Sequence, residues 1–178
     1  MCTRRKKFIA IIGESNAGKS TVISSLTGCG KKCFQGMVTG RIHEGGNDEK
    51  IYVITSSPQE ERLDKNYDTD IIPFQNILNE VIQENCLGLV MAIQPIKNPI
   101  KTLSITQMVQ EVQKHREYEP FLFVLNPGYN DRNRSQHIFE IVQNHLRNTG
   151  LEELNGRRFA FLNARYINQV SQLYPNSL

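Results

Sequence analysis

The sequence predicts an α/β fold of three layers, in which helices cover both faces of a mostly parallel sheet of about six strands with one antiparallel edge strand. Short apolar runs of strand type alternate with amphipathic helical patterns, as in parallel sheets that are covered on both faces. One short glycine-rich turn joins two neighbouring strands as a hairpin. The 178 residues, of which 39% are hydrophobic and 22% charged, suit a single domain over residues 1–178.

Each expected strand is a short apolar or β-branched run that ends at a turn signal. The first run, Phe8-Ile9-Ala10-Ile11-Ile12, ends at Gly13, and the hairpin turn is Gly45-Gly46-Asn47-Asp48. The segment that precedes this turn is expected to be an edge strand or an extended segment. The expected strands cover residues 7–12, 34–42, 50–55, 87–93, 121–125 and 158–162.

Each expected helix carries apolar residues three or four positions apart. The first helix follows a glycine-rich loop and ends near Gly28, because glycine is a helix stop signal there. The expected helices cover residues 21–27, 71–84, 103–112, 138–146 and 163–173. Residues 56–70 are polar and residues 94–101 contain two prolines, so both segments are expected to form loops.

The segment Gly13-Glu14-Ser15-Asn16-Ala17-Gly18-Lys19-Ser20 matches the phosphate-loop pattern G-x-x-x-x-G-K-[ST] and lies between a predicted strand and a predicted helix. This placement aims several backbone N–H groups at one phosphate, at the positive end of a helix dipole. Lys19 is expected to stabilise the charge of the outer phosphates, and the Ser20 hydroxyl to bind Mg²⁺. The predicted phosphate-binding residues are Gly13, Glu14, Ser15, Asn16, Ala17, Gly18, Lys19, Ser20 and Thr21.

This loop and the order of the elements after it resemble the Ras-like P-loop GTPases over residues 7–173. The spacing is most similar to the immunity-associated, septin-related branch, in which the loop helix leads to a Phe, a Val-Thr pair and a hairpin. The resemblance implies that Thr39, in Val38-Thr39, contacts Mg²⁺ and the γ-phosphate. It also implies that Asn126 and Asn163 contact the base of GTP or GDP, with Asn163 in a loop after the last strand.

Two motifs of that family are degraded in this chain. Ser56-Ser57-Pro58-Gln59 stands where D-x-x-G would follow the hairpin strand, so the aspartate that holds Mg²⁺ through water is replaced. Asn126-Pro127-Gly128-Tyr129 stands where N-K-x-D would contact guanine, and Tyr129 replaces the carboxylate that accepts hydrogen bonds from that base. Tyr129 could instead stack on a base, and the choice between guanine and adenine stays open. The nearest substitute carboxylates are Glu60 or Glu61 for the metal and Asp131 for the base.

Phosphoryl transfer needs neutralised charge and a positioned water, and a missing arginine finger costs about 10³ to 10⁵ in rate. The sequence offers Lys19, the loop amides and Mg²⁺ on Ser20, with Gln59 or Glu60 the nearest residues to orient water. We therefore expect a GTPase-like protein that binds GTP or GDP with Mg²⁺ and hydrolyses slowly or not at all. Two alternatives stay open. One is an ATP-binding phosphotransferase or ATPase with Arg132 and Arg134 as lid arginines, and the other is a pseudo-GTPase module for protein interaction.

The bulk properties narrow the class of partner. The net charge of +3 is too small to predict binding to nucleic acid. The longest apolar run, residues 86–93, is too short to cross a membrane, and the N-terminus has no apolar signal region. We therefore expect a cytoplasmic protein that binds a nucleotide, and a protein partner or a second copy of itself as a further partner.

Overall fold

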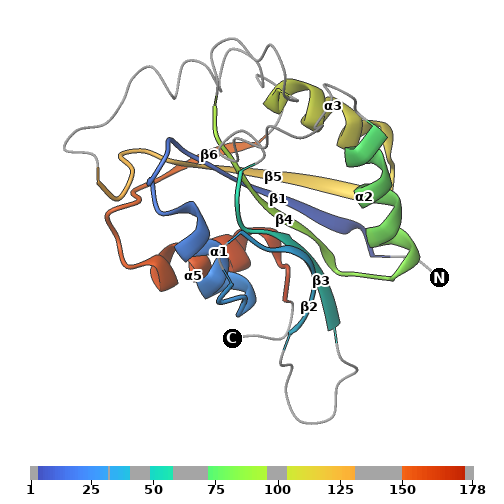
Figure 1. Ribbon diagram of the computed structural model, residues 1–178, viewed down its shortest axis with the longest axis horizontal. Coiled ribbons are helices and arrows are strands. Elements are labelled where there is room, and N and C mark those ends of the chain that lie inside the picture. Colours follow the sequence, from blue (N-terminus) through green and yellow to red (C-terminus); the bar gives the residue numbers. More distant parts are fainter. Residues whose placement is uncertain are drawn as a thin grey trace.

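The computed structural model describes residues 4–31, 33–40, 49–57, 72–95, 104–130 and 150–174. These residues form a sheet with helices on both of its faces (Figure 1). The strands are β1 (Lys6–Ile12), β2 (Gln35–Gly40), β3 (Glu49–Ile54), β4 (Gly88–Ile93), β5 (Tyr118–Leu125) and β6 (Leu151–Leu154). The helices are α1 (Lys19–Thr27), α2 (Ile72–Gln83), α3 (Ile105–Lys114) and α5 (Ala160–Ser171).

The six strands lie in the order β2-β3-β4-β1-β5-β6. β2 and β3 pair antiparallel at one edge, and every other neighbouring pair is parallel. This arrangement confirms the predicted fold class. β1 is central in the sheet, with Ile9 opposite Val90 of β4 and Phe121 of β5. The carboxyl ends of the parallel strands therefore share one edge, where ligands of open α/β sheets bind.

β4 lies between β1 and β3. The order of elements along the chain, from β1 through α1 to the β2–β3 hairpin, is the order that the sequence predicts. This order supports the Ras-like resemblance only as far as an α/β fold with a mostly parallel sheet.

Two hydrophobic cores lie on the two faces of the sheet, because successive side chains of a strand point to opposite faces. Phe8, Ala10 and Ile12 of β1 belong to the core under α2 and α3. Ile9 and Ile11 belong to the core under α1 and α5. The continuous apolar sequence of β1 thus reflects burial on both faces, and this burial fixes the end of β1 from which the glycine-rich loop departs.

The end of the chain differs from the prediction. The strand predicted over residues 158–162 is wrong, since the last strand is β6 and residues 160–162 are the first turn of α5. The apolar run there is typical of a buried strand, yet Phe161 and Leu162 are 59% and 41% exposed. The buried residues of α5 are Asn163, Ala164, Ile167 and Ser171, which share one helical face. β6 escaped detection because Leu-Glu-Glu-Leu is a short, charged edge strand.

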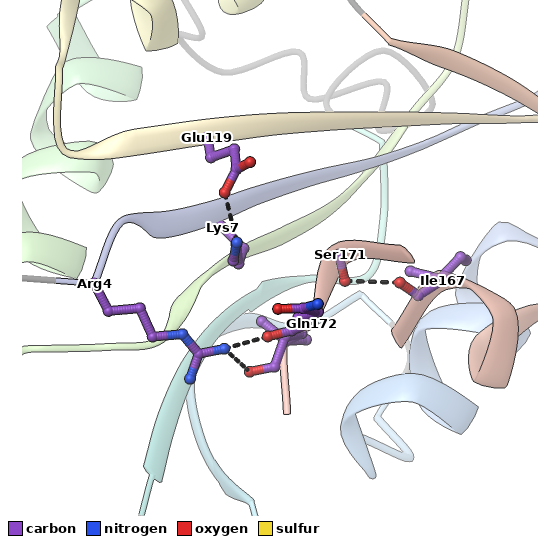
Figure 2. Close-up of polar contacts among 7 residues, drawn as sticks. Arg4, Lys7, Glu119, Ile167, Ser171 and Gln172 are labelled. Carbon is purple, nitrogen blue, oxygen red and sulfur yellow. Dashed lines mark hydrogen bonds and ion pairs between the residues drawn. The ribbon is translucent and has the colours of Figure 1, made fainter. Parts of the chain in front are cut away.

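The far end of α5 is tied to the chain before β1 (Figure 2). The guanidinium of Arg4 donates to the carbonyl oxygens of Gln172 and Leu173, which follow the last residue of α5. A cation is favourable at the negative end of a helix dipole. Figure 2 also shows the ion pair between Lys7 of β1 and Glu119 of β5. The Arg4 contacts hold the carboxyl end of α5 to the chain before β1, and the ion pair joins two neighbouring strands.

Some predicted elements lie outside the described residues, namely the hairpin turn at 45–48, the helix over 138–146 and most of the loop over 56–70. No helix within the part of the chain that the structure describes is long and apolar enough to cross a membrane.

Candidate functional site

The glycine loop, residues 13–18, connects the central strand β1 to α1. The N–H of Gly13 donates to the carbonyl oxygen of Ile93 at the end of β4 (3.1 Å), and the N–H of Ala17 donates to that of Glu14 (3.1 Å). The first bond holds the start of the loop against the sheet, and the second closes a tight turn. Of the predicted loop residues, Ser15 and Asn16 are exposed, and Glu14 is half-buried.

The loop enters α1 through left-handed backbone. Asn16 has φ 61°, and Gly18, the N-cap residue, has φ 92°. No side chain caps the start of α1. The first N–H groups of a helix have no partner within it, and the helix dipole makes that end positive. Here these groups follow directly on the curled loop, which is the arrangement that binds anions at helix N-termini. Thr21, in this first turn, is exposed.

The side chain of Lys19 folds back over the glycine loop. Its Nζ atom donates to the carbonyl oxygens of Gly13 (2.9 Å) and Glu14 (2.7 Å), and only 3% of the residue is exposed. A buried ammonium needs such partners, because taking a charge out of water is costly. The positive charge is therefore held beside the loop and the positive end of α1, where it adds to the attraction for an anion.

Ser20 links α1 to the end of β3. Its hydroxyl donates to the carbonyl oxygen of Thr55 (2.8 Å). Thr55 is fully buried, and its hydroxyl accepts from the N–H of Phe34 (2.8 Å). The residue that follows β3 thus lies beside the first turn of α1, although β4 separates β3 from β1 in the sheet.

Hydroxyl groups stand where the Ras-like resemblance places an aspartate. Ser57 is fully buried, and its Oγ accepts from the N–H of Gln94 at the end of β4 (2.8 Å). Ser56, at the aspartate position itself, is half-buried. Within the described ranges no three His, Cys, Asp or Glu residues are grouped so that they could hold a metal ion.

The β5 loop, residues 126–129, packs against the glycine loop. Asn126 is 3% exposed, and its N–H donates to the carbonyl oxygen of Leu154 (2.8 Å); the Asn126–Pro127 peptide is cis. The N–H of Tyr129 donates to the carbonyl oxygen of Ala17 (3.1 Å). The structure therefore brings Asn126 and Tyr129 to the edge of the sheet that carries the glycine loop, where the sequence placed a base-binding segment.

Gly156, in the loop between β6 and α5, completes a junction of three loops. Its N–H donates to the carbonyl oxygen of Pro127 (2.9 Å). A Cβ at this position would lie 2.9 Å from that oxygen and 3.1 Å from the carbonyl oxygen of Ala17. Sequence reasoning missed this contact because it placed a strand two residues later. The signal was the turn pair Asn155-Gly156.

Asn163 does not lie in a loop after the last strand. It is the fourth residue of α5, is 2% exposed, and its Nδ2 donates to the carbonyl oxygen of Asn155 (3.0 Å). The loop after the last strand is instead formed around Asn155 and Gly156. Asn163 therefore supports that loop from within α5. Its predicted base contact assumed a place in the loop after the last strand, and Asn155 and Gly156 occupy that loop instead.

The structure does not place Thr39 near Ser20, although the sequence predicts that both contact Mg²⁺. It is exposed in β2, where it pairs with Lys50 of β3. Lys50 precedes Thr55 by five residues, which at about 3.3 Å per residue of strand is on the order of 16 Å. Since Ser20 bonds to Thr55, Thr39 lies near the opposite end of the hairpin and does not share a metal site with Ser20 in this structure. The alternatives Gln59, Glu60, Glu61, Asp131, Arg132 and Arg134 lie outside the described residues.

The fold and the site define an α/β protein with a glycine loop and a buried lysine at the carboxyl end of the central strand. Comparison with known proteins gives no match, since no family model, no curated protein and no solved structure is recognisably similar to this chain.

Proposed function

We propose that the glycine loop binds the phosphate chain of a nucleoside triphosphate or diphosphate, and that the protein is GTPase-like, with slow or no hydrolysis. The observation that carries this proposal is the Lys19 ammonium, buried against the carbonyl oxygens of Gly13 and Glu14 at the uncapped start of α1. A phosphate at this position would meet helix amides and a fixed cation together. The sequence pattern of the loop is the one that this chemistry uses.

The Ser20 hydroxyl suits Mg²⁺, which prefers oxygen ligands. A hydroxyl has one proton to donate and two lone pairs to accept with. The bond from Ser20 to the carbonyl oxygen of Thr55 uses the proton and is compatible with a metal on the oxygen. Mg²⁺ bound there would bridge the outer phosphates and neutralise part of their charge.

Slow hydrolysis follows from what lies beside this position. Thr55, Ser56 and Ser57 follow β3 with hydroxyl groups and no carboxylate. No aspartate would hold the water ligands of Mg²⁺ at this position, so we expect Mg²⁺ to bind more weakly than in a site that has one. Nucleotide affinity is expected to survive this loss better than turnover, because binding depends mainly on the loop and Lys19.

The proposal does not decide between guanine and adenine nucleotides, so GTP and ATP are tested under the same conditions. The Ras-like resemblance favours guanine, but Pro127 and Tyr129 replace the lysine and the carboxylate of its N-K-x-D motif. An ATP-binding phosphotransferase or ATPase is therefore kept as the second candidate. The pseudo-GTPase interaction module is the outcome if no nucleotide binds.

Titration calorimetry with GTP, GDP, ATP and ADP, each with Mg²⁺, tests the proposal. The parent is expected to bind at least one of them, and Lys19→Ala is expected to abolish that binding while the far-ultraviolet circular dichroism is retained. Lys31→Ala is the charge-matched control, because Lys31 is exposed beyond the opposite end of α1. Undiminished affinity in Lys19→Ala would show that the glycine loop is not the phosphate site.

A further inference from the structure

We propose that Tyr129 is the stacking surface for the nucleobase, so that the site holds the flat face of a purine and discriminates weakly between guanine and adenine. This inference rests on the proposed function. A base is joined to its phosphates through a single ribose, so it must lie against a residue close to the glycine loop. The β5 loop supplies that residue.

The position of Tyr129 is fixed by its backbone. Its N–H bonds to the carbonyl oxygen of Ala17, in the glycine loop itself. A Cβ on Gly18, the N-cap of α1, would lie 3.4 Å from the Cβ of Tyr129. The tyrosine side chain therefore leaves the backbone next to the first turn of α1, directly beside the proposed phosphate site.

The ring of Tyr129 is not part of the hydrophobic core. The residue is 64% exposed, although its backbone is anchored to the glycine loop. A large aromatic ring that is held in place by its backbone and left open to solvent has a face available for a flat ligand. Aromatic side chains that stack on bases in this way tolerate every base, because each base has a π-face.

Other exposed aromatic residues within the described ranges have different surroundings. Phe159 and Phe161, at the start of α5, stack on each other, with ring centroids 5.8 Å apart and an angle of 25° between planes. Tyr166, further along α5, donates its hydroxyl proton to Glu152 of β6. Tyr129 is distinguished from these three by its direct bond to the glycine loop.

Weak selectivity between guanine and adenine follows from the tyrosine that replaces the aspartate of N-K-x-D at position 129. A site rejects a wrong base strongly when it offers hydrogen bonds to the edge of the right one, because the wrong base leaves buried polar groups unpaired. The residue at the carboxylate position of N-K-x-D is Tyr129, and a phenol does not replace the two acceptors that guanine requires. We expect the affinities for GTP and ATP to agree within about tenfold.

The experiment compares Mg²⁺ complexes of GTP, ATP and inorganic tripolyphosphate, the last of which has phosphates and no base. Tyr129→Ala is expected to weaken GTP and ATP by roughly 5- to 150-fold, the range for loss of one stacked base, and to leave tripolyphosphate unchanged. Tyr129→Phe keeps the ring and is expected to bind like the parent. Phe161→Ala is the control, since it removes an aromatic ring of similar exposure on α5.

Three results would overturn the inference while leaving the proposed function intact. Tyr129→Ala could bind nucleotides like the parent, it could weaken tripolyphosphate as much as nucleotides, or the parent could prefer one purine by more than about tenfold. Failure of the parent to bind tripolyphosphate and all nucleotides would overturn the proposed function, and the stacking role with it.

Discussion

Replacing Gly156 by alanine tests the junction of three loops that builds the candidate site. The new Cβ would lie 2.9 Å from the Pro127 carbonyl oxygen, 3.1 Å from that of Ala17 and 3.2 Å from Cα of Gly128. All three are backbone atoms, so no flexible side chain can move aside. The glycine loop or the β5 loop must shift by a few tenths of an ångström to accept the methyl group.

Overpacking of this kind costs about 1–3 kcal/mol. For a domain of this size, each kcal/mol lowers Tm by about 2–4 °C, so Gly156→Ala is expected to melt roughly 2–12 °C below the parent. Gly150→Ala is the matched control, because within the described residues nothing but its chain neighbours lies within 4 Å of a Cβ there. The control is expected to gain about 0.4–1 kcal/mol, since alanine restricts the unfolded chain.

The assay is thermal unfolding followed by circular dichroism, together with nucleotide titration of each variant. Gly156→Ala is expected to lose affinity as well as stability, because the displaced loops carry the proposed phosphate and base contacts. A Gly156→Ala variant that melts at or above the temperature of Gly150→Ala would refute the reasoning. In that case the three loops would not be in contact as described.

Two further predictions concern the frame around the site. Gly88→Ala should destabilise by about 3 kcal/mol or more in urea unfolding, because its Cβ would lie 2.0 Å from the Lys7 carbonyl oxygen. Unchanged stability would argue against β4 lying beside β1. The pKa of buried Glu111 is lowered below 4.5, first by the hydrogen bond from Lys114 and then by that from Gln75. The stability that this carboxylate adds is thus present above about pH 4.5 and lost as the pH falls through its folded-state pKa. Glu111→Gln should therefore lose less stability than the parent on acidification below about pH 4.5, and equal losses would contradict this linkage.

The glycine loop and its flanking elements were predictable because the signals are local. An apolar run ending at Gly13 and a helical pattern after Lys19 specify strand, turn and helix without reference to the rest of the chain. The buried strands β4 and β5 were predictable for the same reason, since continuous apolar runs indicate burial on both faces.

The order of strands across the sheet could not be read from the chain. The sequence of elements is the same whether β3 or β4 lies beside β1, because that choice depends on packing between elements far apart in sequence. The position of Thr39 likewise depends on strand pairing, and its metal role stays a prediction. Residue spacing placed it near Ser20, whereas its pairing with Lys50 carries it along the hairpin to the other end.

The end of the chain was misread because apolar sequence was equated with burial. Phe159 and Phe161 are 74% and 59% exposed, so these apolar side chains lie on the surface and do not belong to a buried strand. Burial in α5 instead follows Asn163 and Ala164, small or polar residues that a hydrophobic pattern gives little weight. The error placed Asn163 in a loop and hid Gly156, whose N–H donates to Pro127 of the β5 loop.

A crystal structure with Mg²⁺ and a bound nucleotide tests the central claim most directly. The account predicts phosphate oxygens within hydrogen-bond distance of the amides at the start of α1 and of Lys19 Nζ, with Mg²⁺ on Ser20 Oγ. A nucleotide bound elsewhere on the protein, with protein side chains occupying the phosphate position at the glycine loop, would contradict the account.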